Sequence, residues 1–195
     1  MTIRKGEEWG TSVPRPGQLV IATSDRELAA LVGAGERAAL GVSSGDVNAT
    51  VGAPTDRDPM QQLPLDLLRI EADGVSHIAV AHVIVRRSWW RGGIVAVLNV
   101  DRVGRWNVAP RAHPNDGRFD VVAVEPKMTI RQRLQARRRL LQGTHVPHPA
   151  ISTRTGAHEE WHFDRPQRLF VDGAHVGSVQ DLAVVIEADA YVIHV

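Results

Sequence analysis

The chain contains no cysteine, and it lacks any run of the roughly 18 apolar residues that a membrane-spanning helix needs. Without cysteine it can form no disulfide, no thiolate metal site and no cysteine nucleophile. Residues 1–10 have neither an apolar core nor a cleavage signature, which is not typical of a signal peptide. These absences favour a cytoplasmic protein.

The sequence also has few aromatic residues and a small net charge. With one tyrosine, three phenylalanines and no recognised binding module, the sequence does not predict a nucleic-acid partner. The net charge of +1 hides a segregation, because residues 83–139 carry thirteen basic and four acidic side chains. A basic middle favours phosphate-bearing partners or peripheral contact with an anionic membrane, although Arg-rich sequences can also serve only to keep a surface soluble.

The first quarter of the 195-residue chain alternates between strand and helix patterns. Thr23-Ser24-Asp25 is typical of a helix cap, and Gly33 with Gly35 would end the helix that follows. In order, the predicted segments are a strand at Gln18–Ala22, a helix at Arg26–Val32, a strand at Ala38–Val42, and a short helical or turn segment that reaches Pro54. This predicts a small α/β unit, too short for a full doubly wound sheet.

Residues 55–62 are polar and contain a proline, which indicates a linker, and strand patterns follow it. The predicted strands are Leu65–Ile70, His77–Arg86, Ile94–Asp101, Arg118–Val124, Glu160–Phe163, Gln167–Val171, Ala183–Glu187 and Tyr191–Val195. Turn signals separate many of them, at Ala72-Asp73-Gly74, Arg91-Gly92-Gly93, Asn115-Asp116-Gly117 and Asp172-Gly173. Strands at this spacing predict a sandwich or barrel.

One helix interrupts these strands. Thr129 would cap it, and Ile130, Leu134 and Leu141 would share one face. The arginines that project mostly elsewhere are Arg131, Arg133, Arg137, Arg138 and Arg139. They can meet lipid phosphates or simply form a solvated face.

The turn Asn115-Asp116-Gly117 gathers polar chemistry near the end of a strand. Arg111, His113 and Asp116 bring a guanidinium, an imidazole and a carboxylate within six residues. A structural turn does not need that cluster, so it suggests a polar site at the end of a sheet. The alternative for Asp116 is a β-turn aspartate that bonds its own backbone.

His158-Glu159-Glu160-Trp161-His162 matches the HExxH pattern of zinc proteases, which requires a helix. Gly156 and Pro166 leave no room for a long helix. As a strand, the segment would place His158, Glu160 and His162 on the solvent face. We therefore predict no metal site.

Arg86-Arg87-Ser88-Trp89-Trp90-Arg91 combines cations with adjacent indoles at the end of a predicted hairpin. Such a tip can insert at a membrane interface. The alternative is that one tryptophan packs in the core and the other stacks on an arginine.

About two-thirds of the chain resembles the diacylglycerol kinase and sphingosine kinase-like family of lipid kinases, whose fold is shared with NAD kinases. Asn115-Asp116-Gly117-Arg118-Phe119-Asp120-Val121 is similar to that family's Asp-Asp-Gly-Leu-Leu-Asp-Val turn and strand. Ile130–Leu141, Gly143-Thr144-His145 and Asp172-Gly173-Ala174 look like its helix, its Gly-x-His segment and its Asp-Gly-Glu. The resemblance implies a catalytic role for Asp116, although Asn115 has removed the carboxylate pair.

The front of the chain resembles the family only in part. The family's phosphate-binding Gly-Gly-Asp-Gly-Thr falls where Thr23-Ser24-Asp25-Arg26-Glu27 stands, and only Asp25 matches. Its second nucleotide loop resembles the segment from Ser43 to Pro54, which implies cofactor contacts from Asp25, Ser44, Gly45 and Asp46. Side-chain bulk and the charge of Glu27 disfavour a triphosphate, so ATP and Mg²⁺ are expected only if kinase activity is retained.

The expected fold is α+β, with a reduced α/β unit over residues 1–58 and a β-rich sandwich with one prominent helix over residues 59–195. The favoured function is a degenerate lipid-kinase-like protein that binds a lipid or phosphorylated ligand in the cleft between the two parts. Candidate ligand-binding residues are Arg86, Arg87, Arg111 and His113. The alternatives are an active ATP-dependent lipid kinase with an atypical nucleotide loop, with or without completion by dimerisation, and an interaction module that pairs with a separate nucleotide-binding chain. A homodimer is expected because an incomplete α/β unit exposes unpaired backbone.

Overall fold

The computed structural model describes residues 9–195, so most of the prediction about residues 1–10 lies outside the described residues. The helices are α1 (Asp25–Gly33), α2 (Asp46–Val51) and α3 (Ile130–Leu140). The strands are β1 (Thr11–Val13), β2 (Leu19–Ala22), β3 (Ala39–Val42), β4 (Met60–Ala72), β5 (Val75–Ala79), β6 (His82–Arg86), β7 (Ile94–Leu98), β8 (Arg102–Val103), β9 (Trp106–Asn107), β10 (Phe119–Val124), β11 (Ile151–Gly156), β12 (His158–Val171) and β13 (Ala174–His194). None of the helices in this part of the chain is both long and apolar enough to cross a membrane.

The elements β2, α1, β3 and α2 follow one another as the sequence patterns predicted. β2 pairs with β3 in parallel, with Leu19 opposite Ala39, and α1 connects the two strands. The Ser24 side chain accepts a hydrogen bond from the Glu27 N–H at 3.2 Å, which is the predicted N-cap. Leu28 of α1 is fully buried and packs in the core beside β2 and β3.

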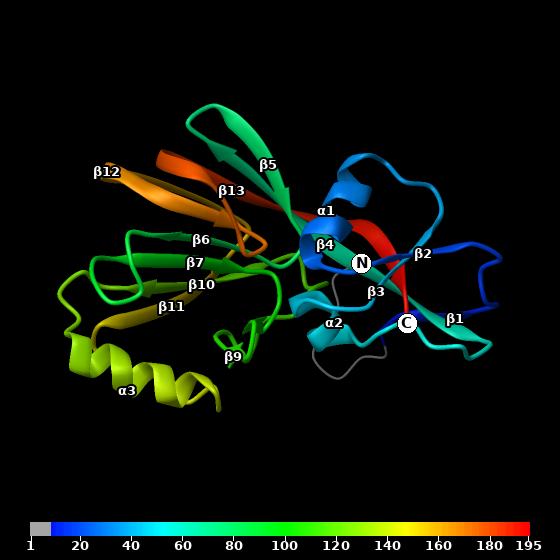
Figure 1. Ribbon diagram of the computed structural model, residues 1–195, viewed down its shortest axis with the longest axis horizontal. Helices are drawn as coiled ribbons and strands as arrows, with labels where there is room; N and C mark the ends of the chain where they lie inside the picture. The colour runs from blue at the N-terminus through cyan, green and yellow to red at the C-terminus, as the bar shows by residue number, and fades with distance from the viewer. Residues whose placement is uncertain (1–8) are drawn as a thin grey trace.

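Most strands belong to one hydrogen-bonded sheet, whose main path runs β1-β4-β13-β12-β6-β7-β10-β11. The sheet folds over into the predicted β-rich sandwich: β4, β5, β12 and β13 form one layer, and β6, β7, β10 and β11 form the other (Figure 1). α3 lies below the second layer, while α1 and α2 lie beyond the sandwich, near the middle of the molecule in this view (Figure 1). β13 pairs with both β3 and β4, so the division between residues 1–58 and 59–195 stays a prediction.

The layer of β6, β7, β10 and β11 has two covered faces. Val83, Val85 and Val97 point into the core between the layers. Ile84 and Ala96 point the opposite way, toward α3. Burial on both faces explains why the middle of β6, residues 83–85, is an uninterrupted apolar run rather than an alternating one.

Several strand boundaries differ from the predictions for a tertiary reason. The predicted strand His77–Arg86 is interrupted at Val80-Ala81, whose N–H groups bond to Asp172. The two predicted segments before Asp172 merge into the single long strand β12. β4 begins at the buried Met60, inside the predicted linker. β11 was missed because Ile-Ser-Thr-Arg-Thr-Gly lacks an apolar pattern and pairs only on its β10 side in the main path.

α3 begins where the sequence predicted, but its apolar face points outward. Thr129 and Gln132 form a reciprocal capping box at its N-terminus. Ile130 and Leu134 are exposed, whereas Arg133 is only 5% exposed. The expectation that arginines would project away from the protein is therefore wrong for Arg133.

Candidate functional site

A buried polar cluster lies where the start of α1, the start of α2, the start of β6 and the β12–β13 turn meet. It contains Asp25, Asp46, His82 and Asp172. Asp46 Oδ2 lies 3.1 Å from His82 Nε2, and Asp46 Oδ1 accepts the Gly104 N–H at 2.7 Å. The structure thus brings together two of the predicted nucleotide-binding residues, Asp25 and Asp46, but it also supplies them with partners from the protein.

Asp25 occupies the N-terminus of α2. Its carboxylate accepts the N–H of Asp46 at 2.6 Å and the N–H of Val47 at 3.0 Å. Gly45 makes this approach possible: its φ is +109°, and a Cβ at this position would overlap the Asp25 carboxylate. Burial raises the pKa of Asp25 to about 6, against the lowering effect of the two amides. Ser44, in the same loop, is exposed.

His82 and Asp172 complete the cluster. Asp172 accepts the N–H groups of Val80, Ala81 and His82 at 2.9–3.0 Å. Burial works to lower the pKa of His82, but the hydrogen bond to Asp46 and the charges of Asp172, Asp46 and Asp25 raise it overall. Burial raises the pKa of Asp172. The imidazole and the surrounding carboxylates therefore favour each other's charged forms.

Glu27 closes the turn between β2 and α1. Its carboxylate accepts the Thr23 N–H at 2.8 Å and the Thr23 hydroxyl at 2.6 Å. These bonds to Thr23 lower the pKa of Glu27. The Thr23 backbone amide at this turn is consequently already bonded.

A second polar cluster surrounds the Asn115-Asp116-Gly117 turn. Asp66 is fully buried, and its carboxylate accepts the N–H of Gly117 at 2.7 Å and of Asp189 at 2.9 Å. Burial raises the pKa of Asp66 to about 6. Asp66 was missed by the sequence reasoning, although a lone aspartate within the apolar run of β4 was a usable signal.

Asp116 bonds the backbone of its own turn. Its Oδ1 accepts the Arg118 N–H at 3.0 Å, and burial raises its pKa. His113 lies beside it: Nδ1 accepts the Asn115 N–H at 3.3 Å, and the ring contacts Trp9 at a centroid distance of 4.8 Å. The role of Asp116 in catalysis stays a prediction.

The four candidate ligand-binding residues do not form one site. Arg111 is exposed and lines an open groove of about 910 Å³ together with Asp120 and Arg154. Burial raises the pKa of Asp120 to about 6, and Arg111 counteracts this. Arg86 lies at the opposite end of β6 from His82, with its guanidinium 4.2 Å from the Trp89 ring centroid.

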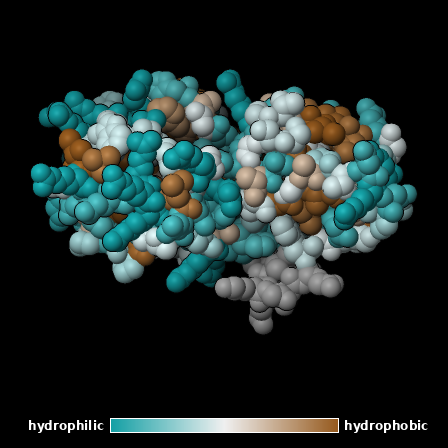
Figure 2. Space-filling view, turned by 60° about the horizontal axis from the view of Figure 1, so that its bottom comes forward, coloured by the Kyte–Doolittle hydropathy of each residue, from teal (hydrophilic) through white to brown (hydrophobic). Residues whose placement is uncertain are grey.

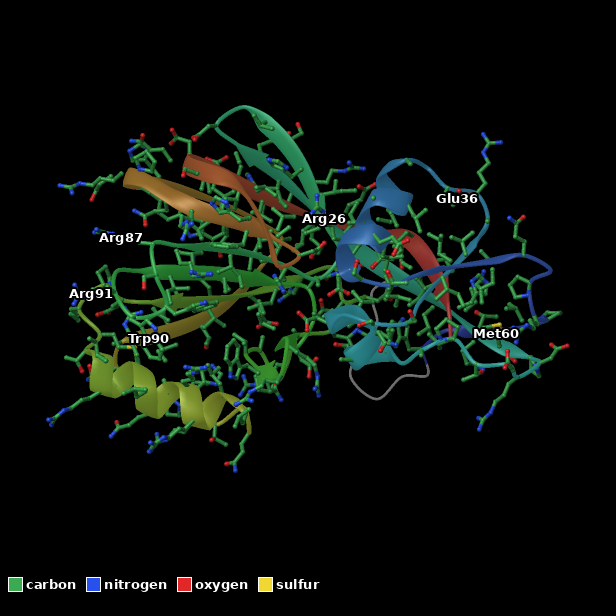
Figure 3. The ribbon with its side chains drawn as sticks, in the orientation of Figure 1. Arg26, Glu36, Met60, Arg87, Trp90 and Arg91 are labelled. Carbon is green, nitrogen blue, oxygen red and sulfur yellow. The ribbon has the colours of Figure 1, made fainter. Side chains whose placement is uncertain are left out.

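Arg87 is exposed beyond Arg86, at the end of the β6–β7 hairpin (Figure 3). The same figure shows Trp90 and Arg91 beside it, above one end of α3. The hairpin tip thus forms a separate basic and aromatic feature, far along β6 from the two acidic clusters.

An apolar cavity of about 320 Å³ lies between α3 and the β6–β7–β10–β11 layer. Trp89 and Trp106 line one side, and Ile84, Met128 and Ala136 contribute much of the rest. Such a volume falls within the ~300–1,000 Å³ typical of small-molecule sites. None of the acidic residues described above lines it, and the sequence reasoning did not identify it.

Two basic side chains border this cavity. Arg133 donates hydrogen bonds to the carbonyls of Met128, Trp89, Gly92 and Glu125, so its charge is satisfied by backbone. His145 is 2% exposed, and burial lowers its pKa against a smaller contribution from the Val108 backbone. The cavity therefore presents an apolar wall with a neutral imidazole.

The HExxH segment is part of strand β12, as its sequence context indicated. His158, Glu160 and His162 are exposed, while Trp161 packs at the edge of the sandwich core. His162 Nδ1 lies 2.6 Å from Asp181 Oδ1 on the neighbouring strand. Across residues 9–195, no group of three or more His, Asp or Glu side chains is arranged to hold a metal ion.

The sandwich with its flanking helix defines an NAD kinase-like β-sandwich. Residues 60–193 match the family model described as the YegS C-terminal NAD kinase beta sandwich-like domain, and the chain belongs to this family. No curated protein matches the chain by sequence.

Solved structures share the fold. A diacylglycerol kinase from Bacillus anthracis str. Sterne matches with a TM-score of 0.63 and 12% identity, over 90% of this chain and 75% of that one. A second structure from that organism, named as a candidate diacylglycerol kinase, matches with a TM-score of 0.66 and 10% identity, over 90% and 77% of the two chains. At this identity the likeness establishes a diacylglycerol kinase-like fold.

Proposed function

We propose that this protein is a degenerate member of the lipid-kinase fold that binds a lipid and does not transfer phosphate from ATP. The observation that carries the proposal is the apolar cavity between α3 and the sheet. Its lining by Ile84, Met128, Trp89 and Trp106 suits an acyl chain or a similar apolar body. The cleft near Asp46 and Asp116, expected from the sequence, is a less suitable place because the carboxylates there already have protein partners.

The occupied backbone amides support the loss of nucleotide binding. Asp25 takes the N–H groups of Asp46 and Val47, and Glu27 takes the Thr23 N–H. Phosphate loops work by directing free N–H groups at the ligand, and here carboxylates stand where phosphate oxygens would lie. The residues therefore do not fit ATP.

The open groove offers a place for the polar end of the ligand. The cavity and the groove share the lining residues Val108, Val122 and Ile151, so the polar end of a ligand in the cavity would lie near the groove. Arg154 is already paired with Glu159, which leaves Arg111 as the cation that a phosphorylated or otherwise anionic headgroup would meet. This arrangement favours a single-chain amphiphile.

Two titrations test the proposal. A fluorescent fatty acid, kept below its micelle concentration, should bind the protein and quench tryptophan emission, because Trp89, Trp90 and Trp106 line the cavity. ATP with Mg²⁺ should leave the melting temperature unchanged. Absence of fatty-acid binding would remove the proposed function.

The other functions give different results. An active kinase with an atypical loop, including one completed by a homodimer, would show a rise in melting temperature with ATP and Mg²⁺. An interaction module would bind neither compound and would be stabilised by a separate nucleotide-binding chain.

A further inference from the structure

α3 and the β6–β7 turn together form an outward surface that mixes apolar and basic side chains. Ile130 and Leu134 on α3 and Leu141, just after it, are 47%, 43% and 50% exposed, and Trp89 and Trp90 on the turn are 40% and 37% exposed. We call this surface the α3 face. Figure 2 shows apolar patches set among hydrophilic side chains on the half of the molecule that carries α3.

The charge of the α3 face has one sign. Its arginines are Arg87, Arg91, Arg131, Arg137, Arg138 and Arg139. α3 itself contains no acidic residue, and the nearby Glu125 is paired with Lys127 at 2.8 Å. The surface therefore offers positive charge to an anionic partner.

Hydrogen bonds hold the two parts of this face in a fixed relation. Arg133, buried under α3, donates to the carbonyls of Trp89 and Gly92 in the turn and of Glu125 before the helix. The Arg137 guanidinium lies 5.4 Å from the Trp90 ring centroid. Helix and turn consequently present their exposed side chains together, without further rearrangement.

We propose that the α3 face docks onto the surface of an anionic lipid bilayer. Indole rings and arginine side chains are favoured at the headgroup level, and isolated leucines of an amphipathic helix enter the acyl boundary. Each arginine near an anionic surface adds attraction that falls with salt. A second copy of the chain fits poorly, since a two-fold contact would set one group of arginines against the same group.

Docking would also place the cavity beside the membrane. Trp89, Trp90 and Arg137 belong both to the α3 face and to the cavity lining. A lipid could then pass from the bilayer into the cavity without crossing water. This last step rests on the proposed function, whereas docking itself does not.

Flotation of the full chain with vesicles tests the docking. Vesicles of phosphatidylcholine and phosphatidylglycerol should carry the protein, and vesicles of phosphatidylcholine alone, or high salt, should not. Arg131→Gln/Arg138→Gln should weaken partitioning on the order of thirtyfold. Ile130→Gln/Leu134→Gln should weaken it on the order of tenfold or more.

Matched controls lie elsewhere on the surface. Val75 and Val176 are also exposed, at 56% and 40%, and Arg26 is an exposed arginine on α1 (Figure 3). Val75→Gln/Val176→Gln and Arg26→Gln should partition like the unmodified protein. Unchanged melting temperatures in all variants would show that folding is intact.

Three results would overturn the docking proposal. The first is equal flotation of the α3-face variants and the controls. The second is tight binding to a nucleic-acid duplex that the same variants abolish, without flotation. The third is a concentration-dependent dimer that disappears in Ile130→Gln/Leu134→Gln. Fatty-acid binding by Ile130→Gln/Leu134→Gln, measured in solution without vesicles, tests the cavity separately. This measurement therefore distinguishes a failure of the docking proposal from a failure of the proposed function.

Discussion

The carboxylate of Asp25 lies 2.6 Å from the backbone nitrogen of Asp46, 21 residues further along the chain. The contact joins the first residue of α1 to the first residue of α2. It gives the protein an internal anion at a helix start, where negative charge is favourable. The same contact makes this place unsuitable for a phosphate.

Gly45→Ala tests how far the structure depends on this contact. The new Cβ would overlap the Asp25 carboxylate, and the alanine would have to keep a φ of +109°. We expect a loss of about 2–4 kcal/mol in unfolding free energy, measured by urea denaturation. Gly52→Ala is the control, because Gly52 has a φ of +98° with nothing within 4 Å of the added Cβ. Equal losses in both variants would show that the Asp25 contact adds nothing.

The pKa of Asp25 predicts a pH dependence of stability. Its folded pKa of about 6 lies above the ordinary 3.8, so the folded chain binds more protons between these values. The unfolding free energy should therefore fall as the pH rises from about 4 to about 6, by about 3 kcal/mol at most from this group. Asp25→Asn should flatten that part of the curve.

The measurement compares urea unfolding of the variant and the unmodified protein across this range. Asp56→Asn serves as the control, since Asp56 is an exposed carboxylate near Arg15. Parallel curves for Asp25→Asn and the unmodified protein would contradict the assigned pKa.

Arg133→Met tests the buried guanidinium under α3. It removes hydrogen bonds to the carbonyls of Met128, Trp89 and Glu125, which lie at buried or partly buried positions and would lose these partners. We expect a loss of about 2–4 kcal/mol in unfolding free energy and a change in tryptophan emission. Arg131→Met, on the exposed face, should cost less than about 0.5 kcal/mol. A neutral effect of Arg133→Met would mean that the helix is held by apolar contacts alone.

Ala136→Leu should fill part of the cavity. Ala136 is 9% exposed and lines the cavity from α3, so the larger side chain enters existing space. Fatty-acid affinity should fall on the order of tenfold, while the melting temperature stays equal or rises. Ala30→Leu, at an exposed position on α1, should change neither. Unchanged affinity in Ala136→Leu would place the ligand elsewhere.

Much of the fold could be predicted because its signals are local. Asp73-Gly74 and Asp172-Gly173 are turns with positive φ, as their residue types indicated. The cap at Ser24 and the alternation of exposed residues in His158–Phe163 were likewise readable from neighbouring residues. Strand ends were harder to predict, because the length of β4 and β13 depends on their pairing with each other rather than on the composition of either strand.

The sequence by itself determined most of the strand segments, where α1 and α3 begin, and that the central part is basic, since each follows from side chains adjacent in the chain. Only the tertiary structure decided that Arg133 is buried and Ile130 exposed, because backbone carbonyls of a distant turn supply the partners that the guanidinium needs. It likewise decided that Asp66 accepts the Gly117 N–H, 51 residues away. Helix periodicity defines two faces, but the groups packed against the helix choose which face is covered.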